Sequence, residues 1–301
     1  LHQIIYKLIT VSPDTLEKKK TIDFSIFLKK NGFKNINFIE GKIIHWMSGS
    51  SRFSRDHKTK VLLFKLLTII LPLFSNSNDP DSGFNNFCSV LENISIATNL
   101  FTLLLNNYNL FNLFTNILTT SPRLAKLISI YPDVLDSFIQ TSPSSEILSK
   151  DNYKELLILN SNKYNEEEKL ENLRRTHREF HFRICLQVFL KLINLKQAGI
   201  AFTNLANACL DIIIPISLSN VSKRYGKCPC NFGLVMFGRF ASKEMNAASD
   251  LDFVVVYNEN LNQLSNKQTA ASIYFARFAR TLINHLSAPM AEGRLYETDM
   301  R

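Results

Sequence analysis

The chain has 301 residues, of which 46% are hydrophobic and 20% charged, and this balance excludes a globally disordered polypeptide. A chain of this length accommodates two domains with sizeable cores. Its net charge of +9 is compatible with nucleic-acid binding. However, the cations are dispersed and no recognised nucleic-acid motif accompanies them, so we expect no nucleic-acid partner.

Up to about residue 220 the sequence pattern is helical. Ser121 and Pro122 offer an N-cap followed by proline at the first helical position. Residues 166–197 are predicted to form one long helix, because acidic residues at a helix start are favoured by the helix dipole. The greater part of the chain is therefore predicted to be a helical array.

Two apolar stretches in this array, 61–74 and 205–219, are interpreted as buried helices. Each contains a charged residue and a proline, and each is shorter than the roughly 20 apolar residues that a membrane span requires. We therefore expect no membrane association, and no secretory signal is evident. The five cysteines are odd in number and show no disulfide framework, so a reducing cytoplasm is the simplest context.

Two patterns that resemble metal sites do not predict zinc binding. His177 and His181 lie one helical turn apart, but Arg178 stands where the zinc-protease motif has glutamate. We interpret the pair as two partly exposed helix histidines. Cys228 and Cys230 have no second ligand pair at zinc spacing, so they are assigned to a loop.

Residues 233–257 carry the strongest chemical signal. An apolar run reaches Gly238, passes a short basic loop and re-enters an apolar run through Asp250 and Asp252. Alternate residues of a strand share one face, so the two carboxylates are expected close together. They repel one another unless a cation lies between them, and Mg²⁺ prefers such oxygen ligands. A bare Asp-x-Asp is usually an acidic turn, but the glycine loop and the apolar strand favour phosphoryl or nucleotidyl transfer.

A second acidic strand is predicted over residues 294–301, after an amphipathic helix within residues 266–287. If the strand is extended, Glu297, Asp299 and Arg301 share one face with Leu295. Strand, loop, acidic strand, helix and second acidic strand is the order in which a nucleotidyltransferase core brings a third carboxylate beside the first two. Asp299 is the candidate for that group, with Glu297 in reserve.

Motifs of a known enzyme family match three stretches, GRFASKEM (238–245), SDLD (249–252) and YETDMR (296–301). At these residues the chain resembles the glutamate–ammonia ligase (glutamine synthetase) adenylyltransferases. That family has a Gly-Lys-Leu-Gly-Gly/Ser-Arg/Lys-Glu-Leu/Met loop, then Ser-Asp-Leu/Ile-Asp, and later Tyr-Glu-Val-Asp-Met-Arg. Upstream, residues 32–55, 76–87 and 119–139 look like the helical region that links the two catalytic copies of these bifunctional enzymes. The resemblance covers nearly the whole chain.

The resemblance implies a fold of class α + α/β, in which a helical array precedes a nucleotidyltransferase core of the DNA polymerase β type. Residues 1–105 would be the central helical linker region and residues 106–301 the adenylyltransferase domain. That domain would have a helical lead-in over 106–220 and a core over 221–301 that is incomplete on its C-terminal side. The wording SAPMAEGRLYETDMR is most similar to the second catalytic copy. A first residue other than methionine and an end inside a motif suggest a fragment.

In function, the resemblance implies transfer of AMP from ATP to a tyrosine of glutamine synthetase, which regulates nitrogen assimilation. Removal of that AMP by phosphorolysis would belong to the first catalytic copy. The expected partners are glutamine synthetase and a PII-type signalling protein. The carboxylates that would act in catalysis and hold Mg²⁺ are Asp250, Asp252 and Asp299. The residues that would bind the nucleotide are Gly238, Arg239, Ser242, Lys243 and Ser249.

The loop departs from the family pattern at three positions. Arg239 replaces a lysine and keeps the charge as a planar fork, and Phe240 replaces a leucine. Ala241 replaces a glycine, so its Cβ is expected to crowd the approach of phosphate oxygens or to strain the loop. Ser242 retains a hydroxyl donor. No general base is evident, and one of the carboxylates would have to serve.

Two alternatives stay open. The chain is either an enzyme or a non-catalytic helical module that binds glutamine synthetase or a regulator. Within the enzyme class, an RNA-extending nucleotidyltransferase shares the Asp-x-Asp geometry. Metal-dependent ATP binding would separate the enzyme from the module, and the acceptor, protein or RNA, would separate the two enzymes.

Overall fold

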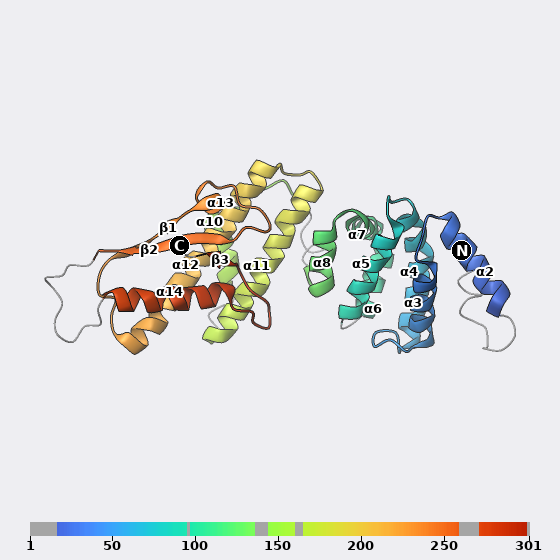
Figure 1. The fold of residues 1–301 in the computed structure, drawn as a ribbon, viewed down its shortest axis with the longest axis horizontal. Helices are drawn as coiled ribbons and strands as arrows, with labels where there is room; N and C mark the ends of the chain where they lie inside the picture. The colour runs from blue at the N-terminus through green and yellow to red at the C-terminus, as the bar shows by residue number, and fades with distance from the viewer. Residues whose placement is uncertain (1–16, 95–96, 136–143, 160–164, 259–270, 300–301) are drawn as a thin grey trace. The chain divides into compact units, whose positions relative to one another are not determined.

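The computed structural model covers residues 17–94, 97–135, 144–159, 165–258 and 271–299 (Figure 1). Within these ranges the chain is mostly helical and has one small three-stranded sheet. The predicted sequence of a helical array followed by strands is confirmed at this level. The chain divides into two compact units, residues 1–140 and residues 141–301.

The first unit is helical wherever the structure describes its secondary structure as regular. A cluster of aromatic rings forms part of its core, in which the Trp46 ring lies 5.7 Å from Phe84 and 6.1 Å from Phe87, measured between centroids. The predicted buried helix over 61–74 is confirmed within α4, where Leu63, Leu67 and Phe74 are fully buried. The helices are α2 (Glu17–Lys30), α3 (Ile36–Ser48), α4 (His57–Ser75), α5 (Pro80–Asn93), α6 (Ala97–Asn106), α7 (Tyr108–Thr120) and α8 (Pro122–Ile130).

The second unit combines long helices with the sheet. Antiparallel pairing joins β1 to β2, and parallel pairing joins β2 to β3, with α14 as the crossover between them (Figure 1). This is the predicted order of strand, turn, strand, helix and strand. The elements are α10 (Lys150–Ile158), α11 (Glu166–Phe189), α12 (Leu195–Tyr225), β1 (Phe232–Met236), α13 (Gly238–Ala241), β2 (Leu251–Tyr257), α14 (Ala271–Ser287) and β3 (Thr298–Asp299).

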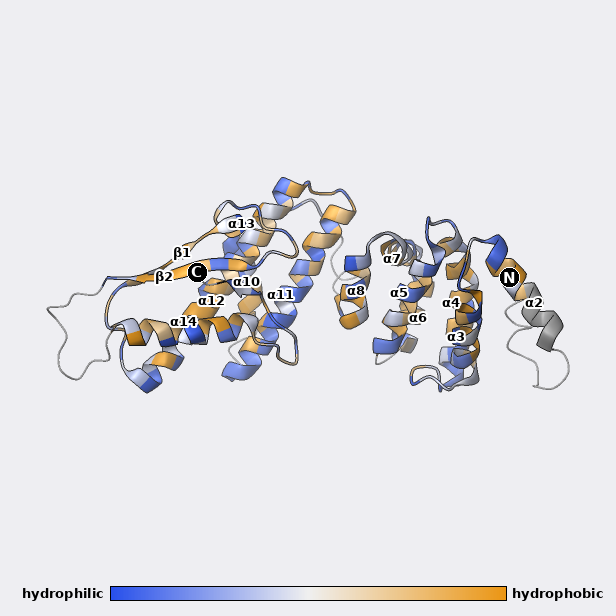
Figure 2. Ribbon diagram, viewed as in Figure 1, coloured by the Kyte–Doolittle hydropathy of each residue, from blue (hydrophilic) through white to orange (hydrophobic). Residues whose placement is uncertain are grey.

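One face of α14 packs on the sheet and on α12. Figure 2 shows hydrophobic residues along β1 and β2, while α14 alternates between hydrophobic and hydrophilic residues. The Phe232 ring of β1 lies 5.3 Å from Phe275 and 5.1 Å from Phe278 of α14. Burying such a side chain contributes about 1.5–3 kcal/mol relative to leaving it exposed. These contacts fix the helix that leads the chain from β2 to β3.

Among the described helices, α12 alone is long and apolar enough to cross a membrane by length and composition. Of its most apolar stretch, 56% is buried inside the structure. Leu205, Cys209 and Ile213 on this helix are fully buried. The predicted buried helix over 205–219 is therefore confirmed as part of α12.

The predicted single helix over residues 166–197 is wrong, because two helices occupy this range. The chain leaves α11 after Phe189, and Lys191 takes a left-handed conformation with φ 58°. Asn194 then starts α12 with a capping box: its side chain accepts from the Gln197 N–H, and the Gln197 side chain accepts from the Asn194 N–H. Such caps satisfy amides that a new helix start leaves unpaired, so they outweigh the continuing helical periodicity.

Candidate active site

The parallel pairing of β2 with β3 places two of the predicted carboxylates side by side. Asp252 is the register partner of Asp299, and Leu251 that of Thr298. The Leu251 N–H donates to the Glu297 carbonyl oxygen at 2.9 Å, which fixes this register. Directly paired residues point to the same face of a sheet, and neighbouring strands lie about 4.7–4.9 Å apart. Asp250 is exposed and lies just before β2. It is two residues from Asp252, and alternate residues of an extended chain point to the same face.

The glycine that begins α13, Gly238, lies directly against the Asp252 carboxylate. The Phe237 N–H donates to the Asp252 carbonyl oxygen at 2.9 Å, which brings the turn to the start of β2. Gly238 has φ 58°, and a Cβ at this position would collide with the Asp252 carboxylate. Glycine is required here for two reasons, its left-handed backbone and the space that the carboxylate occupies.

The basic loop is a short helical turn rather than an open cradle. Backbone amides of residues 241–244 donate to carbonyl oxygens of residues 237–240 in the same turn, at 2.9–3.3 Å. They are therefore not available to a phosphate. Ala241 is exposed and does not have positive φ, so the expectation that its Cβ strains the loop is wrong. Besides Gly238, the left-handed residue of the loop is Lys243, with φ 59°.

The side chains of this turn fall into two groups. Arg239 and Lys243 are exposed and have no ion-pair partner among the residues that the structure describes. They lie in the turn that precedes Asp250 and Asp252 in the chain. The Ser242 hydroxyl lies 3.2 Å from a Glu244 carboxylate oxygen and 3.4 Å from the Arg239 carbonyl oxygen, so an acceptor within the turn already engages it.

The segment between the turn and β2 is organised by its own side chains. The Asn246 N–H donates to the Ser249 hydroxyl oxygen at 2.9 Å, and the Ala248 N–H donates to the Asn246 side-chain oxygen at 2.8 Å. Ser249, predicted to bind the nucleotide, thus shapes the loop that leads into Asp250. The pattern Asn246-x-x-Ser249 is a typical signal for such a turn, and sequence reasoning missed Asn246.

Two residues of distant helices support this loop, and neither was predicted. A Cβ on Gly199 of α12 would lie 2.9 Å from the Lys243 carbonyl oxygen and 3.1 Å from the Glu244 Cα, so only glycine lets the helix approach the loop backbone this closely. His181 of α11 holds its Nε2 atom 3.1 Å from the Ala247 carbonyl oxygen. These contacts join segments far apart in the chain, so no local sequence signal reveals them.

The segment before Asp299 departs from the predicted extended strand. Both the Leu295 and the Tyr296 N–H donate to the Leu286 carbonyl oxygen, at 3.0 and 3.1 Å, and both side chains are buried. Consecutive side chains are therefore buried together instead of alternating between two faces, and in this segment only Thr298 and Asp299 pair as a strand. Glu297 is exposed and pairs with Arg294 at 2.6 Å. Arg301 lies outside the described residues.

Buried arginines of α11 hold this segment from behind. Arg178 donates to the Glu292 carbonyl oxygen at 3.0 Å and to its carboxylate at 2.9 Å. The Glu292 N–H donates to the Glu171 carboxylate at 2.8 Å. Arg174 donates to the His285 carbonyl oxygen at the end of α14, at 3.1 Å. Together these bonds clamp the chain between α14 and β3.

His177 is buried, so the interpretation of two partly exposed helix histidines is wrong for this residue. Its ring lies 4.8 Å from Tyr296 and 5.9 Å from His181, between centroids. The pKa of His177 is lowered to about 3, mainly by burial and in addition by the nearby His181 and Arg178 charges. His177 is therefore neutral in the fold and packs as an aromatic ring behind β3 rather than as a metal ligand.

The donor atoms at the site suit a hard cation, although they are not gathered into a complete coordination set. Asp252 and Asp299 offer carboxylate oxygens from paired positions, and such ligands suit Mg²⁺. Within the ranges that the structure covers, no group of three or more His, Cys, Asp or Glu side chains is arranged to hold a metal ion. The chemistry of the donors fits Mg²⁺, and the arrangement brings two of the three predicted ligands into register.

Comparison with known proteins decides the family. The family model for glutamate-ammonia ligase adenylyltransferase matches residues 111–301. The chain belongs to this family. A bifunctional glutamine synthetase adenylyltransferase/adenylyl-removing enzyme of Rhizobium meliloti is 32% identical over 294 residues, 96% of this chain and 29% of the relative. The enzymes of the same name from Brucella suis and Agrobacterium fabrum are each 30% identical, over 91% and 96% of the chain and 28% and 29% of their own lengths.

Membership of the glutamate-ammonia ligase adenylyltransferase family confirms the resemblance that the motifs indicated. An adenylyltransferase uses ATP as its substrate, and the names of the relatives give glutamine synthetase as the protein on which those relatives act. The chain spans less than a third of the length of these relatives. The activity and the partners of the whole relatives are therefore only proposed for this chain.

Proposed function

We propose that this chain carries the adenylyl-transfer site of a bifunctional glutamine synthetase adenylyltransferase, and that it passes AMP from ATP to a tyrosine of glutamine synthetase. The observation that carries the proposal is the register of Asp252 with Asp299, formed beside Gly238, which leaves room for the Asp252 carboxylate. Phosphorolytic removal of AMP is assigned to another part of the longer protein. We further propose that the adenylyltransferase domain begins at residue 106 and that its core has the DNA polymerase β fold.

The proposed reaction is the displacement of pyrophosphate from ATP by a tyrosine hydroxyl. The tyrosine hydroxyl oxygen attacks the α-phosphorus of ATP, the bond from that phosphorus to the bridging oxygen breaks, and pyrophosphate leaves. Asp250, Asp252 and Asp299 would hold Mg²⁺, which neutralises the phosphates and orients them for in-line displacement. The tyrosine proton passes to a carboxylate of this group, because no separate base is evident among the described residues near it.

Each loop residue has a distinct proposed role. Arg239 and Lys243 attract the triphosphate, since both are exposed cations without ion-pair partners in the described part of the chain. Gly238 leaves room for the Asp252 carboxylate. Ser242 would have to leave its acceptors in the turn to reach a phosphate, whereas Ser249 holds the loop before Asp250. We place the reaction in the cytoplasm, with a PII-type protein as regulator and without nucleic acid or membrane.

The proposal is tested by two measurements on the 301-residue chain. Calorimetry with ATP, with and without Mg²⁺, measures nucleotide binding, and transfer of radiolabelled AMP to glutamine synthetase measures the reaction. Asp252→Asn and Asp299→Asn should each lower Mg²⁺-dependent binding and reduce transfer by orders of magnitude, while Glu297→Gln should not. Asn is close in shape to Asp, and circular dichroism checks the fold.

Each contrary result has a specific meaning. Absence of metal-dependent ATP binding in the parent chain would favour the non-catalytic interaction module. Incorporation of AMP into RNA rather than glutamine synthetase would favour an RNA-extending enzyme. Loss of transfer in Glu297→Gln, with Asp299→Asn active, would move the third carboxylate to Glu297.

A further inference from the structure

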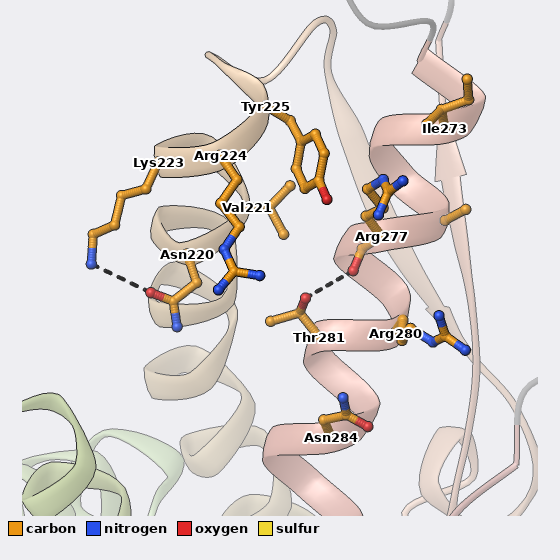
Figure 3. A pocket seen from close by; sticks show the side chains of 11 residues that line it. Asn220, Val221, Lys223, Arg224, Tyr225, Ile273, Arg277, Arg280, Thr281 and Asn284 are labelled. Atoms are coloured by element: carbon orange, nitrogen blue, oxygen red, sulfur yellow. Dashed lines mark hydrogen bonds between the residues drawn. The ribbon is translucent and has the colours of Figure 1, made fainter.

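A second candidate site lies between the C-terminal turns of α12 and the outer face of α14, on surfaces that the proposed reaction does not use (Figure 3). The groove has a volume of about 870 Å³, which falls in the range of ligand-binding clefts. None of the predicted carboxylates or loop residues lines it. The groove is therefore distinct from the candidate active site.

The charges on this groove are all of one sign. Lys223 and Arg224 of α12 and Arg277 and Arg280 of α14 line it, and no carboxylate does. Lys223 reaches Glu166 outside the groove at 3.5 Å. Arg224 and Arg280 are exposed and have no ion-pair partner in the described ranges of the chain. Like charges held together without counter-charges lower stability, so an anionic partner would relieve them.

The four cations are spread across the groove rather than gathered around one point. Figure 3 shows Arg224 and Arg277 between the two helices, while Lys223 extends from the outer side of α12 and Arg280 from the far side of α14. Thr281 and Asn284 add polar groups along α14. A compact phosphate needs donors that converge, whereas a chain of spaced carboxylates matches a broad row of cations.

The aromatic ring of the groove does not favour nucleic acid. The Arg277 guanidinium lies 4.4 Å from the centroid of the Tyr225 ring and covers one face of it. Binding of single-stranded nucleic acid relies on aromatic faces on which bases stack. This ring instead holds Arg277 in place, which orders one of the cations that line the groove.

We propose that the groove between α12 and α14 docks an acidic segment of a partner protein, rich in Asp or Glu. Arg224 and Arg277 bind carboxylates within the groove, and Lys223 and Arg280 bind those that lie on either side. The proposal is independent of the adenylyl-transfer reaction, because it concerns other residues and a binding event rather than a chemical step.

The test measures binding of a fluorescein-labelled glutamate-rich peptide by fluorescence anisotropy, with a glutamine-rich peptide of equal length as the uncharged probe. The double variant Arg224→Gln/Arg280→Gln removes two cations of the groove. The matched control Arg52→Gln/Arg55→Gln removes two exposed cations of the first unit, so the net charge is equal in both. We expect about tenfold weaker binding in the groove variant only, because exposed charge contacts contribute modestly each.

Four outcomes decide the matter. Selective weakening in the groove variant, with thermal unfolding unchanged, supports the docking surface. Equal weakening in both variants would reduce the effect to net charge and overturn the proposal. Displacement of the peptide by single-stranded RNA at lower concentration than by free glutamate peptide would assign the groove to nucleic acid. Displacement by inorganic phosphate or ATP would assign it to a phosphate ligand.

Discussion

At the scale of single residues, Gly238 has the most direct influence on the candidate site. Substituting alanine would force a strained backbone at φ 58° and drive its Cβ into the Asp252 carboxylate. We therefore expect Gly238→Ala to weaken Mg²⁺-dependent ATP binding, measured by calorimetry, because the carboxylate must move.

A matched control lies on the adjacent strand. At Gly233 of β1 a Cβ would make an ordinary contact with Val256, 3.8 Å away, and the backbone is not left-handed. Gly233→Ala should leave nucleotide binding unchanged. Unchanged binding in Gly238→Ala would show that the Asp252 carboxylate does not need its present position.

His177 makes the stability of the fold dependent on pH. Its pKa is about 3 in the fold, below the ordinary value of a histidine, so between these values the unfolded chain binds a proton that the folded chain does not. The free energy of unfolding should therefore rise with pH across this window and fall on acidification, by up to about 1.4 kcal/mol per pH unit. Urea unfolding at several pH values measures the slope.

His177→Phe should flatten this dependence, since phenylalanine keeps the ring contact with Tyr296 and cannot bind a proton. The control is His57→Asn at the exposed start of α4, which should leave the slope unchanged. An equal slope in His177→Phe and the parent protein would assign the acid sensitivity to other groups.

The sequence predicts those residues of the site whose partners lie nearby in the chain or follow from the order of the elements. The spacing of Asp250 and Asp252 and the glycine before them are sequence signals, and the pairing of Asp252 with Asp299 follows the predicted order of elements. The burial of His177 depends on Tyr296, which is distant in the chain. Helical spacing cannot reveal such a contact, so the histidine was assigned to the wrong environment.

At the scale of elements, the clamp between α11 and the segment before β3 is the feature most open to test. Arg178 is buried and binds both the carbonyl oxygen and the carboxylate of Glu292. Breaking a buried pair leaves polar groups unsatisfied. We expect Arg178→Gln to lower the free energy of unfolding by on the order of 3 kcal/mol, measured by urea denaturation.

The control uses an exposed pair of the same segment. Arg294→Gln removes the ion pair with Glu297, whose side chains are 52% and 72% exposed, and should cost less than about 1 kcal/mol. A double-mutant cycle with Glu292→Gln separates the pair from the other bonds of Arg178. Similar small losses in Arg178→Gln and Arg294→Gln would show that α11 does not clamp this segment.

Element boundaries were predicted less well than element types. The capping pair Asn194 and Gln197 is a readable signal, yet the apolar periodicity on both sides of it favoured one continuous helix. The bend at Leu295 and Tyr296 had no such signal, because one carbonyl oxygen of α14 accepts from both amides. Tertiary hydrogen bonds of this kind decide a strand's length only after the helix is in place.

At the scale of the whole molecule, the boundary between the two compact units differs from the residue at which the family match begins. The family model matches from residue 111, whereas the packing of the chain separates residues 1–140 from residues 141–301. Helices α7 and α8 therefore belong by packing to the first unit. The functional division at residue 106 stays a prediction.

The second unit has its own core, which includes Leu205, Phe253 and Phe278, each almost fully buried. We expect residues 141–301, produced as a separate chain, to unfold in one cooperative transition when heated, followed by circular dichroism. A broad transition without cooperativity would show that this core needs the first unit.

The two kinds of strand pairing imply an order of assembly. Residues 237–250 join the antiparallel strands β1 and β2, a shorter connection than residues 258–297 between β2 and β3, so the contact of Gly238 with Asp252 closes at the lower entropic cost. Parallel pairing with β3 waits for α14 to cross the sheet and dock. A partly folded chain therefore holds Gly238 beside Asp252 before Asp299 has joined them. A nucleotide that binds at this stage of folding is not consumed, because the group of carboxylates is still incomplete.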